Sequence, residues 1–207
     1  MTNDLGQPGV KQIFGVLAMK RRSFVSLFCL VALSTMASHA TAQQDPPPAG
    51  HALTTIASLD VPRYMGTWFE IAKYPNWFQK KCATGARADY SLMADGQVQV
   101  INRCRLAGGE MTEAMGMARQ IGPATSPRLQ VRFAPSWLSF LPFVWGDYWV
   151  IDLDQDYQLV AVSEPRRQYL WILSRTPQVD PVRYQRLLSR LQQQGFDLGR
   201  LETTPQD

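Results

Sequence analysis

The chain has 207 residues and a formal net charge of +4, from 21 Lys and Arg against 17 Asp and Glu. Most of this excess belongs to residues 1–42, because their removal leaves 17 basic and 16 acidic residues. The charge of +1 that remains is not the basic surface that binds nucleic acid, and about 165 residues suit a single domain.

The N-terminus has the pattern of a secretory signal peptide. Lys20-Arg21-Arg22 precedes an apolar run from Phe24 to Leu33, and Ala40-Thr41-Ala42 supplies small residues for cleavage. The run is too short to span a membrane. We therefore predict a signal peptide over 1–42, a Pro-containing tether over 43–59 and a folded domain over 60–207.

Three details of the leader stay open. Met19 is an alternative start, and Arg21 to Val25 resembles a twin-arginine motif, so the general secretory and twin-arginine routes both fit. Cys29 raises the question of lipidation, but it lies inside the apolar run and follows bulky residues. Cleavage after Ala42 fits the pattern better.

Apolar and polar residues alternate with period two through most of the domain, which is typical of an antiparallel meander. Turn signals such as Ala94-Asp95-Gly96 separate the segments. Eight strands are predicted, over 66–75, 84–93, 97–102, 110–121, 129–133, 147–153, 158–163 and 168–175. The fold class is therefore all-β, and closing the strands into an up-and-down antiparallel β-barrel leaves no exposed edges.

One α-helix is predicted after the strands. Asp180 suits the N-cap, Pro181 the first turn and Gly195 the C-terminal stop. Its leucines share one face, so the helix should pack outside the barrel wall, and residues 196–201 are a candidate short strand.

Cys82 and Cys104 are the two cysteines left after export. They lie toward the same end of neighbouring predicted strands, so we expect a disulfide, with two separate thiols as the alternative.

Gly66-Thr67-Trp68 opens the first strand, and Arg175 closes the last one about a hundred residues later. With the strands between them, these residues resemble the lipocalins, most closely the bacterial lipocalin and apolipoprotein D branch. The resemblance covers nearly all of the mature chain. It implies a barrel with an open mouth and a floor that Arg175 closes by stacking on Trp68. The predicted floor residues are Gly66, Trp68, Asp154, Tyr157 and Arg175.

The resemblance favours a cavity over a barrel filled by side chains. Alternation from Trp68 places Glu70 and Tyr74 inside. On strand 147–153 it leaves a choice, and we expect Trp149 and Ile151 to face inward because the other face would bury Asp152. The predicted ligand-lining residues are Glu70, Tyr74, Ala88, Tyr90, Val98, Val100, Leu129, Val131, Phe133, Trp149, Ile151, Tyr169 and Trp171.

Glu70 is an acid at an apolar position. We expect a structural role, as acceptor from Tyr90 or Tyr169, although it could also orient a headgroup. A carboxylate there disfavours a second carboxylate, so a fatty acid should enter tail first.

The segment 136–145 is apolar where a loop should be polar. In an up-and-down barrel it shares the mouth end with the loop that carries Trp77 and Phe78. Exposed aromatics there indicate a membrane contact or a lid, and the sequence leaves both open. The predicted mouth residues are Trp77, Phe78, Trp137, Phe140, Phe143 and Trp145.

Three methionines on one face of a strand, Met111, Met115 and Met117, fit an outward homodimer surface or an inward pliable lining. Both histidines, His39 and His51, precede the barrel, so a histidine-based catalytic or zinc site is not expected in it. We therefore predict no enzyme activity, metal or cofactor.

The sequence predicts an exported periplasmic protein that binds a fatty acid, lysophospholipid or similar lipid. Association with the outer membrane is an additional possibility. A role in lipid transport or envelope maintenance is implied by the resemblance. The alternatives are a carrier of a pigment or tetrapyrrole, and a membrane-docking adaptor that uses loop 136–145.

Overall fold

The computed structural model describes residues 52–206. The chain divides into two units, Met1–Gln43 and Gln44–Asp207, and the described residues belong to the second. The predicted signal peptide, with its alternatives at Met19, Arg21 to Val25 and Cys29, lies outside them.

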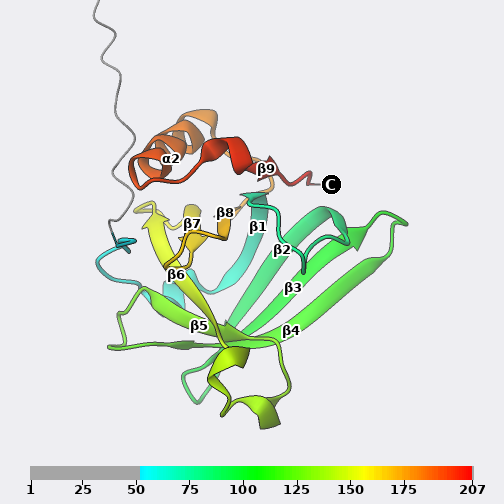
Figure 1. The fold of residues 1–207 in the computed structure, drawn as a ribbon, viewed down its shortest axis with the longest axis vertical. Helices are drawn as coiled ribbons and strands as arrows, with labels where there is room; N and C mark the ends of the chain where they lie inside the picture. Colours follow the sequence, from blue (N-terminus) through cyan, green and yellow to red (C-terminus); the bar gives the residue numbers. More distant parts are fainter. Residues whose placement is uncertain (1–51, 207) are drawn as a thin grey trace, which may run out of the picture. The chain divides into compact units, whose positions relative to one another are not determined.

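Eight strands form the closed antiparallel barrel that the alternation predicts (Figure 1). Each strand pairs with the next, and β1 pairs with both β8 and β2 to close the sheet. The strands are β1 Gly66–Lys73, β2 Cys82–Leu92, β3 Val98–Leu106, β4 Met111–Gln120, β5 Arg128–Arg132, β6 Gly146–Leu153, β7 Leu159–Ser163 and β8 Leu170–Ser174.

The barrel is paired more completely at one end than at the other. Strand β4 pairs with β5 only through Met117 to Gln120, so the first half of β4 has no partner on that side. Strands β1 and β2 pair only through Gly66 to Phe69. Beyond that point the side-chain amide of Gln206 bridges them, donating to the carbonyls of Glu70 and Ala86. The open end is therefore a wide mouth.

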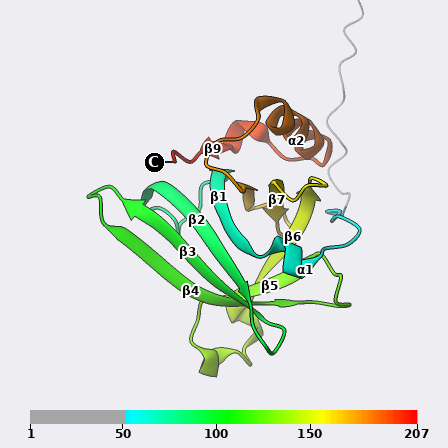
Figure 2. The same cartoon turned by 180° about the vertical axis from the view of Figure 1, so that it is seen from behind.

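Two α-helices flank the barrel. Helix α1 (Val61–Tyr64) precedes β1 and lies beside its start (Figure 2). Helix α2 (Pro181–Gln193) is the predicted one, with the Asp180 side chain accepting from the Arg183 N–H. It lies outside the barrel over β6, β7 and β8. The predicted strand over 196–201 is instead a 3-10 helix (Leu198–Arg200), and the short strand β9 (Glu202–Thr203) follows it.

Two apolar clusters share the barrel wall. The inner cluster fills the closed end of the barrel around Trp68, Val150 and Val160. The outer cluster joins the wall to α2 through Leu187 and Leu191. Residues 52–59, which the sequence assigned to the tether, contribute to both, since Leu53 belongs to the outer cluster and Leu59 to the inner one.

Two β-bulges change which side chains face inward. On β1 the register shifts between Glu70 and Ala72, so Glu70 points in whereas Tyr74 packs against Phe196 in the outer cluster. The prediction that Tyr74 lines the interior was wrong because a bulge reverses strict alternation.

A similar shift occurs on β6 between Val150 and Asp152. It lets Tyr148 and Val150 face inward while Asp152 points outward, where Arg190 of α2 donates two hydrogen bonds to it. The prediction that Trp149 and Ile151 face inward was therefore wrong. Both side chains pack in the outer cluster instead.

Within residues 52–206, no helix combines the length and the apolar character needed to cross a membrane.

Candidate ligand-binding cavity

The barrel encloses a cavity of about 1010 Å³ with a mainly apolar lining. This is the size of pocket that holds a ligand with a long apolar part. Ten of the predicted lining residues border it: Glu70, Ala88, Tyr90, Val98, Val100, Leu129, Val131, Phe133, Tyr169 and Trp171. The other three, Tyr74, Trp149 and Ile151, do not border it.

Other lining residues were missed from the sequence. Tyr148 was rejected through the argument about Asp152, whereas Tyr64 lies in the short helix α1, which has no alternation to reveal its direction. The inward face of β4 carries Ala114 and Ala118, and alternation from the outward methionines could have identified both.

The floor of the barrel is closed by Arg175 and Trp68, as the sequence predicts. The Arg175 Cζ lies 4.0 Å from the centroid of the Trp68 ring. The same guanidinium donates to the carbonyls of Tyr157, Thr67 and Arg63. Burial lowers the pKa of Arg175 from its ordinary value, and the nearby Tyr64 and Tyr90 act in the opposite direction.

Gly66 is required beside this stack. Its φ is +96°, and a Cβ there would lie 3.2 Å from Arg175 Nη1. A larger residue would be strained by the backbone and would crowd the guanidinium.

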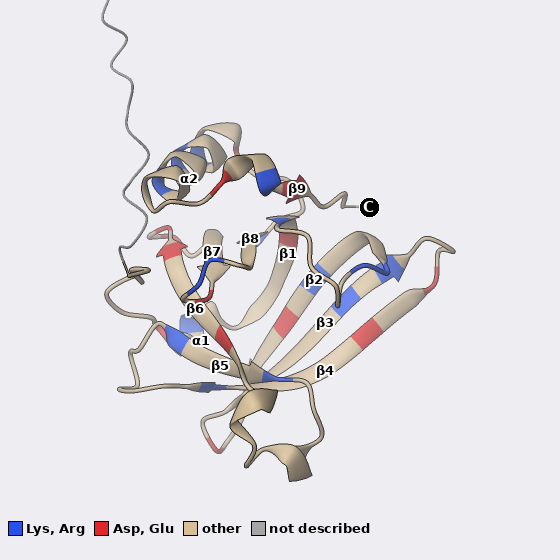
Figure 3. Ribbon diagram, viewed as in Figure 1, with Lys and Arg blue, Asp and Glu red and all other residues tan. Residues whose placement is uncertain are grey.

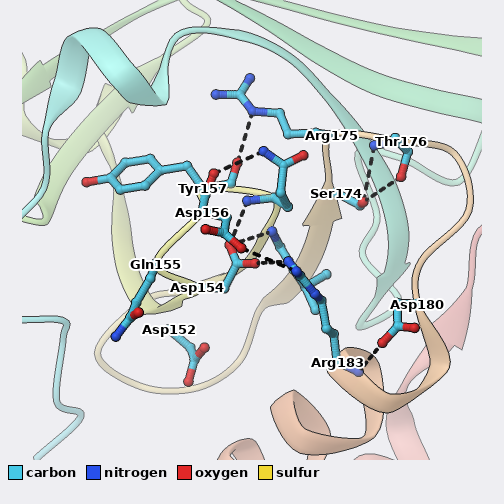
Figure 4. Close-up of polar contacts among 12 residues, drawn as sticks. Asp152, Asp154, Gln155, Asp156, Tyr157, Ser174, Arg175, Thr176, Asp180 and Arg183 are labelled. Atoms are coloured by element: carbon cyan, nitrogen blue, oxygen red, sulfur yellow. Dashed lines mark hydrogen bonds and ion pairs between the residues drawn. The ribbon is translucent and has the colours of Figure 1, made fainter.

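The turn from Asp154 to Tyr157 supports the floor (Figure 4). Asp154 Oδ1 accepts from the N–H groups of Gln158 (2.6 Å) and Leu159 (3.0 Å), and its other oxygen accepts from Arg183 of α2. Tyr157 has a φ of 59° and presents its carbonyl to Arg175. The roles of these residues are therefore structural.

Three tyrosines form the layer between Trp68 and the cavity. The Tyr148 hydroxyl lies 2.8 Å from that of Tyr64 and 3.1 Å from that of Tyr90. The Tyr64 ring packs on Trp68 at 5.0 Å between centroids. Burial raises the pKa of all three phenols, that of Tyr90 to about 12, so they are neutral hydrogen-bonding groups.

The buried carboxylate of Glu70 is held by three donors. Lys73 Nζ and Thr204 Oγ1 donate to one oxygen at 2.7 and 2.6 Å, and Gln79 Nε2 donates to the other at 2.7 Å. These partners differ from the predicted Tyr90 and Tyr169, but the role is the structural one expected. Glu70 ties β1 to the C-terminal segment and to the β1–β2 loop.

The mouth is bordered by two aromatic loops. Trp77 and Phe78 of the β1–β2 loop and Trp145 of the β5–β6 loop line the cavity opening. Trp137, Phe140 and Phe143 do not line it, and they are 71%, 75% and 79% exposed. The segment from Phe133 to Gly146 carries no charged residue, as its uniform tan colour in Figure 3 shows.

Strand β2 is joined to β3 near the mouth by the expected disulfide between Cys82 and Cys104. On β4, Met111, Met115 and Met117 point outward, opposite the lining Ala114 and Ala118. Their predicted use as a homodimer surface stays a prediction.

No group of three or more His, Cys, Asp or Glu side chains suited to a shared metal ion occurs in the described part of the chain. The cavity offers apolar surface together with the hydroxyl groups of Tyr64, Tyr90 and Tyr148.

A closed eight-stranded barrel with this floor has a counterpart among known proteins. Residues 59–206 match the family model described as a lipocalin-like domain. The chain belongs to the lipocalin family. Lipocalins are typically carriers of small hydrophobic ligands, and the cavity of this lipocalin is consistent with that use.

Curated relatives cover most of this lipocalin. Temperature-induced lipocalin-1 of Arabidopsis thaliana is 39% identical over 156 residues, which cover 74% of this chain and 83% of that protein. Outer membrane lipoprotein Blc of Escherichia coli (strain K12) is 38% identical over 176 residues, covering 84% and 94%. Apolipoprotein D of Mus musculus is 31% identical over 155 residues, covering 72% and 78%. Both branches named in the sequence-based resemblance are thus represented.

Solved structures show the same fold. The cockroach allergen Per a 4 superposes with a TM-score of 0.57 at 19% identity, covering 79% of this chain and 97% of that one. Apocrustacyanin C1 gives a TM-score of 0.56 at 14% identity, covering 72% and 80%.

Proposed function

We propose that this lipocalin carries a single-chain lipid, such as a fatty acid or a lysophospholipid, in its barrel. The observation that carries the proposal is the mainly apolar cavity of about 1010 Å³, which opens at the mouth and ends at the layer of tyrosines above Trp68. An acyl chain inserted there exchanges water for apolar wall along its length, at roughly 0.8 kcal/mol for each buried CH₂ group.

The lipid would enter tail first. The negative charge of Glu70 is already held by Lys73, Thr204 and Gln79, so a lipid carboxylate placed beside Glu70 would have to compete with it for the Lys73 ammonium. At the mouth, Lys81 and Arg166 border the cavity and can meet an anionic headgroup in water. The favourable arrangement therefore has the headgroup at the rim.

We further propose that the protein is exported to a Gram-negative periplasm, with lipid transport or envelope maintenance as its role. The signal-peptide pattern of residues 1–42 supports export. The relative named outer membrane lipoprotein Blc supports a place at the envelope.

Native mass spectrometry of the full-length gene product isolated from periplasm, followed by organic extraction, tests the proposal. A released fatty acid or lysolipid of stoichiometric amount is the expected result. A coloured extract would favour the pigment carrier instead. A protein that is empty and fails to bind added fatty acids contradicts the proposal.

A second activity, contact with a membrane surface, is favoured by the β5–β6 loop. Trp137, Phe140 and Phe143 are exposed beside the mouth, and aromatic residues favour the interfacial zone of a bilayer. Lys80 and Lys81 follow Trp77 and Phe78 in the other mouth loop, where they can meet anionic lipid.

Flotation with vesicles that contain anionic phospholipid tests this contact. Joint replacement Trp137→Ser, Phe140→Ser and Phe143→Ser should abolish flotation while fatty-acid binding continues. Replacement of the outward Met111 and Met115 by Ser, which removes exposed apolar side chains elsewhere, is the matched control. If both triple and control variants float like the wild type, the loop does not bind membranes.

A further inference from the structure

The inner end of the cavity has a polar feature that a plain acyl chain does not use. The hydroxyls of Tyr64, Tyr90 and Tyr148 come from α1, β2 and β6 and converge across the barrel, with Tyr148 in the centre. All three residues border the cavity, whereas Trp68, against which Tyr64 packs, does not. The cluster of hydroxyls is therefore the polar part of the surface that the deepest ligand atoms meet.

The cluster has one more hydroxyl proton than it has hydrogen bonds. Three hydroxyls carry three protons, but the cluster contains two contacts, Tyr64 to Tyr148 and Tyr90 to Tyr148. Each contact uses one proton. Whichever way the bonds point, one O–H has no acceptor among the described residues, and lone pairs on the hydroxyl oxygens are also free. A buried polar group normally has a partner, so the missing one is expected from outside the chain.

The surroundings define the kind of partner. Val98, Val100, Ala118 and Leu129 line this part of the cavity, so the cluster is a local polar spot in an apolar wall. Burial raises the pKa of all three phenols, and the charge of Glu70 raises that of Tyr90 further. The same environment opposes any other negative charge, which excludes a carboxylate at this depth and favours a neutral oxygen.

We propose that Tyr64, Tyr90 and Tyr148 form a subsite for a hydroxyl or carbonyl oxygen at the deep end of the bound molecule. The inference rests on the proposed function, because it assumes an apolar ligand in the barrel. It adds a preference for molecules with an apolar body and a polar group at each end. A ligand of this kind completes the hydrogen bonds of the cluster, whereas a terminal methyl group leaves one O–H unpaired.

Matched ligands test the subsite. Palmitic acid and 16-hydroxypalmitic acid differ in the terminal hydroxyl, and titration with the purified, delipidated protein gives the ratio of their dissociation constants. In a barrel without the subsite, burial of an unpaired hydroxyl weakens binding roughly tenfold or more. The wild type should bind the hydroxylated acid at least as tightly as palmitic acid. For 2-hydroxypalmitic acid, whose hydroxyl stays beside the headgroup, removal of the three phenols should not change the affinity relative to palmitic acid.

Joint replacement Tyr64→Phe, Tyr90→Phe and Tyr148→Phe should leave palmitic acid bound and weaken 16-hydroxypalmitic acid by about tenfold relative to it. Tyr184→Phe, on the outer helix α2, is the matched control and should leave the ratio unchanged. A ratio that is the same in the wild type and in the triple variant overturns the subsite while the proposed function stands. Failure of both acids to bind the wild type overturns both.

A measurement on the wild type alone covers the case in which the triple variant does not fold. In a crystal structure with 16-hydroxypalmitic acid, the terminal oxygen should lie within hydrogen-bond distance of one of the three phenols. A terminal oxygen at the mouth, or one that contacts apolar side chains only, overturns the subsite.

Discussion

The central carbon of the Arg175 guanidinium lies over the Trp68 indole, 4.0 Å from the ring centroid, and the same guanidinium donates to three backbone carbonyls. These carbonyls belong to Arg63, Thr67 and Tyr157, which lie on three separate segments. One side chain thus joins the entry to β1, β1 itself and the β6–β7 turn. The closed end of the barrel depends on this contact, although neither residue borders the cavity.

Replacement Arg175→Lys should lower the free energy of unfolding by about 2 kcal/mol, because an ammonium cannot stack flat and donate to all three carbonyls together. Urea unfolding measures the loss. The exposed Arg186→Lys on α2 is the matched control and should change stability by less than about 0.5 kcal/mol. Equal stability of the two variants would contradict the role given to Arg175. Relative affinities for different fatty acids should stay as in the wild type.

The buried tyrosines predict a loss of stability in alkali. The folded-state pKa of Tyr90 is raised to about 12, above the ordinary value of 10.0. A group with a raised folded-state pKa contributes stability fully below pH 10, and that contribution is lost as the pH rises through 12. Between pH 9 and 11 the free energy of unfolding should therefore fall by about 1 kcal/mol more in the wild type than in Tyr90→Phe. Parallel pH profiles for the two proteins would show that Tyr90 ionises normally.

The Cys82–Cys104 disulfide should stabilise the mouth end of the barrel. It links residues 22 apart in sequence, and a closed loop of that size contributes about 3 kcal/mol in the chain-entropy model. Unfolding of the wild type should occur at a lower urea concentration in dithiothreitol. The double variant Cys82→Ser, Cys104→Ser should match the reduced wild type and should not respond to the reductant. A response of the double variant would mean that the reductant acts elsewhere.

The barrel, its strands and the outer helix could be predicted from the sequence, because alternation and helix-capping residues are local signals, and the floor contact was implied by the resemblance to lipocalins. The inward direction of Tyr148 could not be predicted, because it depends on the β-bulge between Val150 and Asp152. The outward Asp152 carboxylate is paired with Arg190, which lies 38 residues further along the chain. The prediction that Tyr74 faces inward was wrong for the same reason, because β1 also contains a β-bulge. The tyrosine cluster brings together three segments that are distant in sequence, and no local sequence pattern predicts that their side chains come into contact.

The central claim, that the barrel binds an apolar chain in its interior, is tested most directly by two neighbouring substitutions on β4. Ala114 borders the cavity, whereas Met115 does not and points outward from the same strand. Ala114→Trp should occupy part of the cavity and weaken palmitic acid binding at least tenfold, a change of about 1.4 kcal/mol, while Met115→Trp should bind as the wild type does. Equal binding by both variants, with both folded, would contradict the claim that the ligand lies in the barrel.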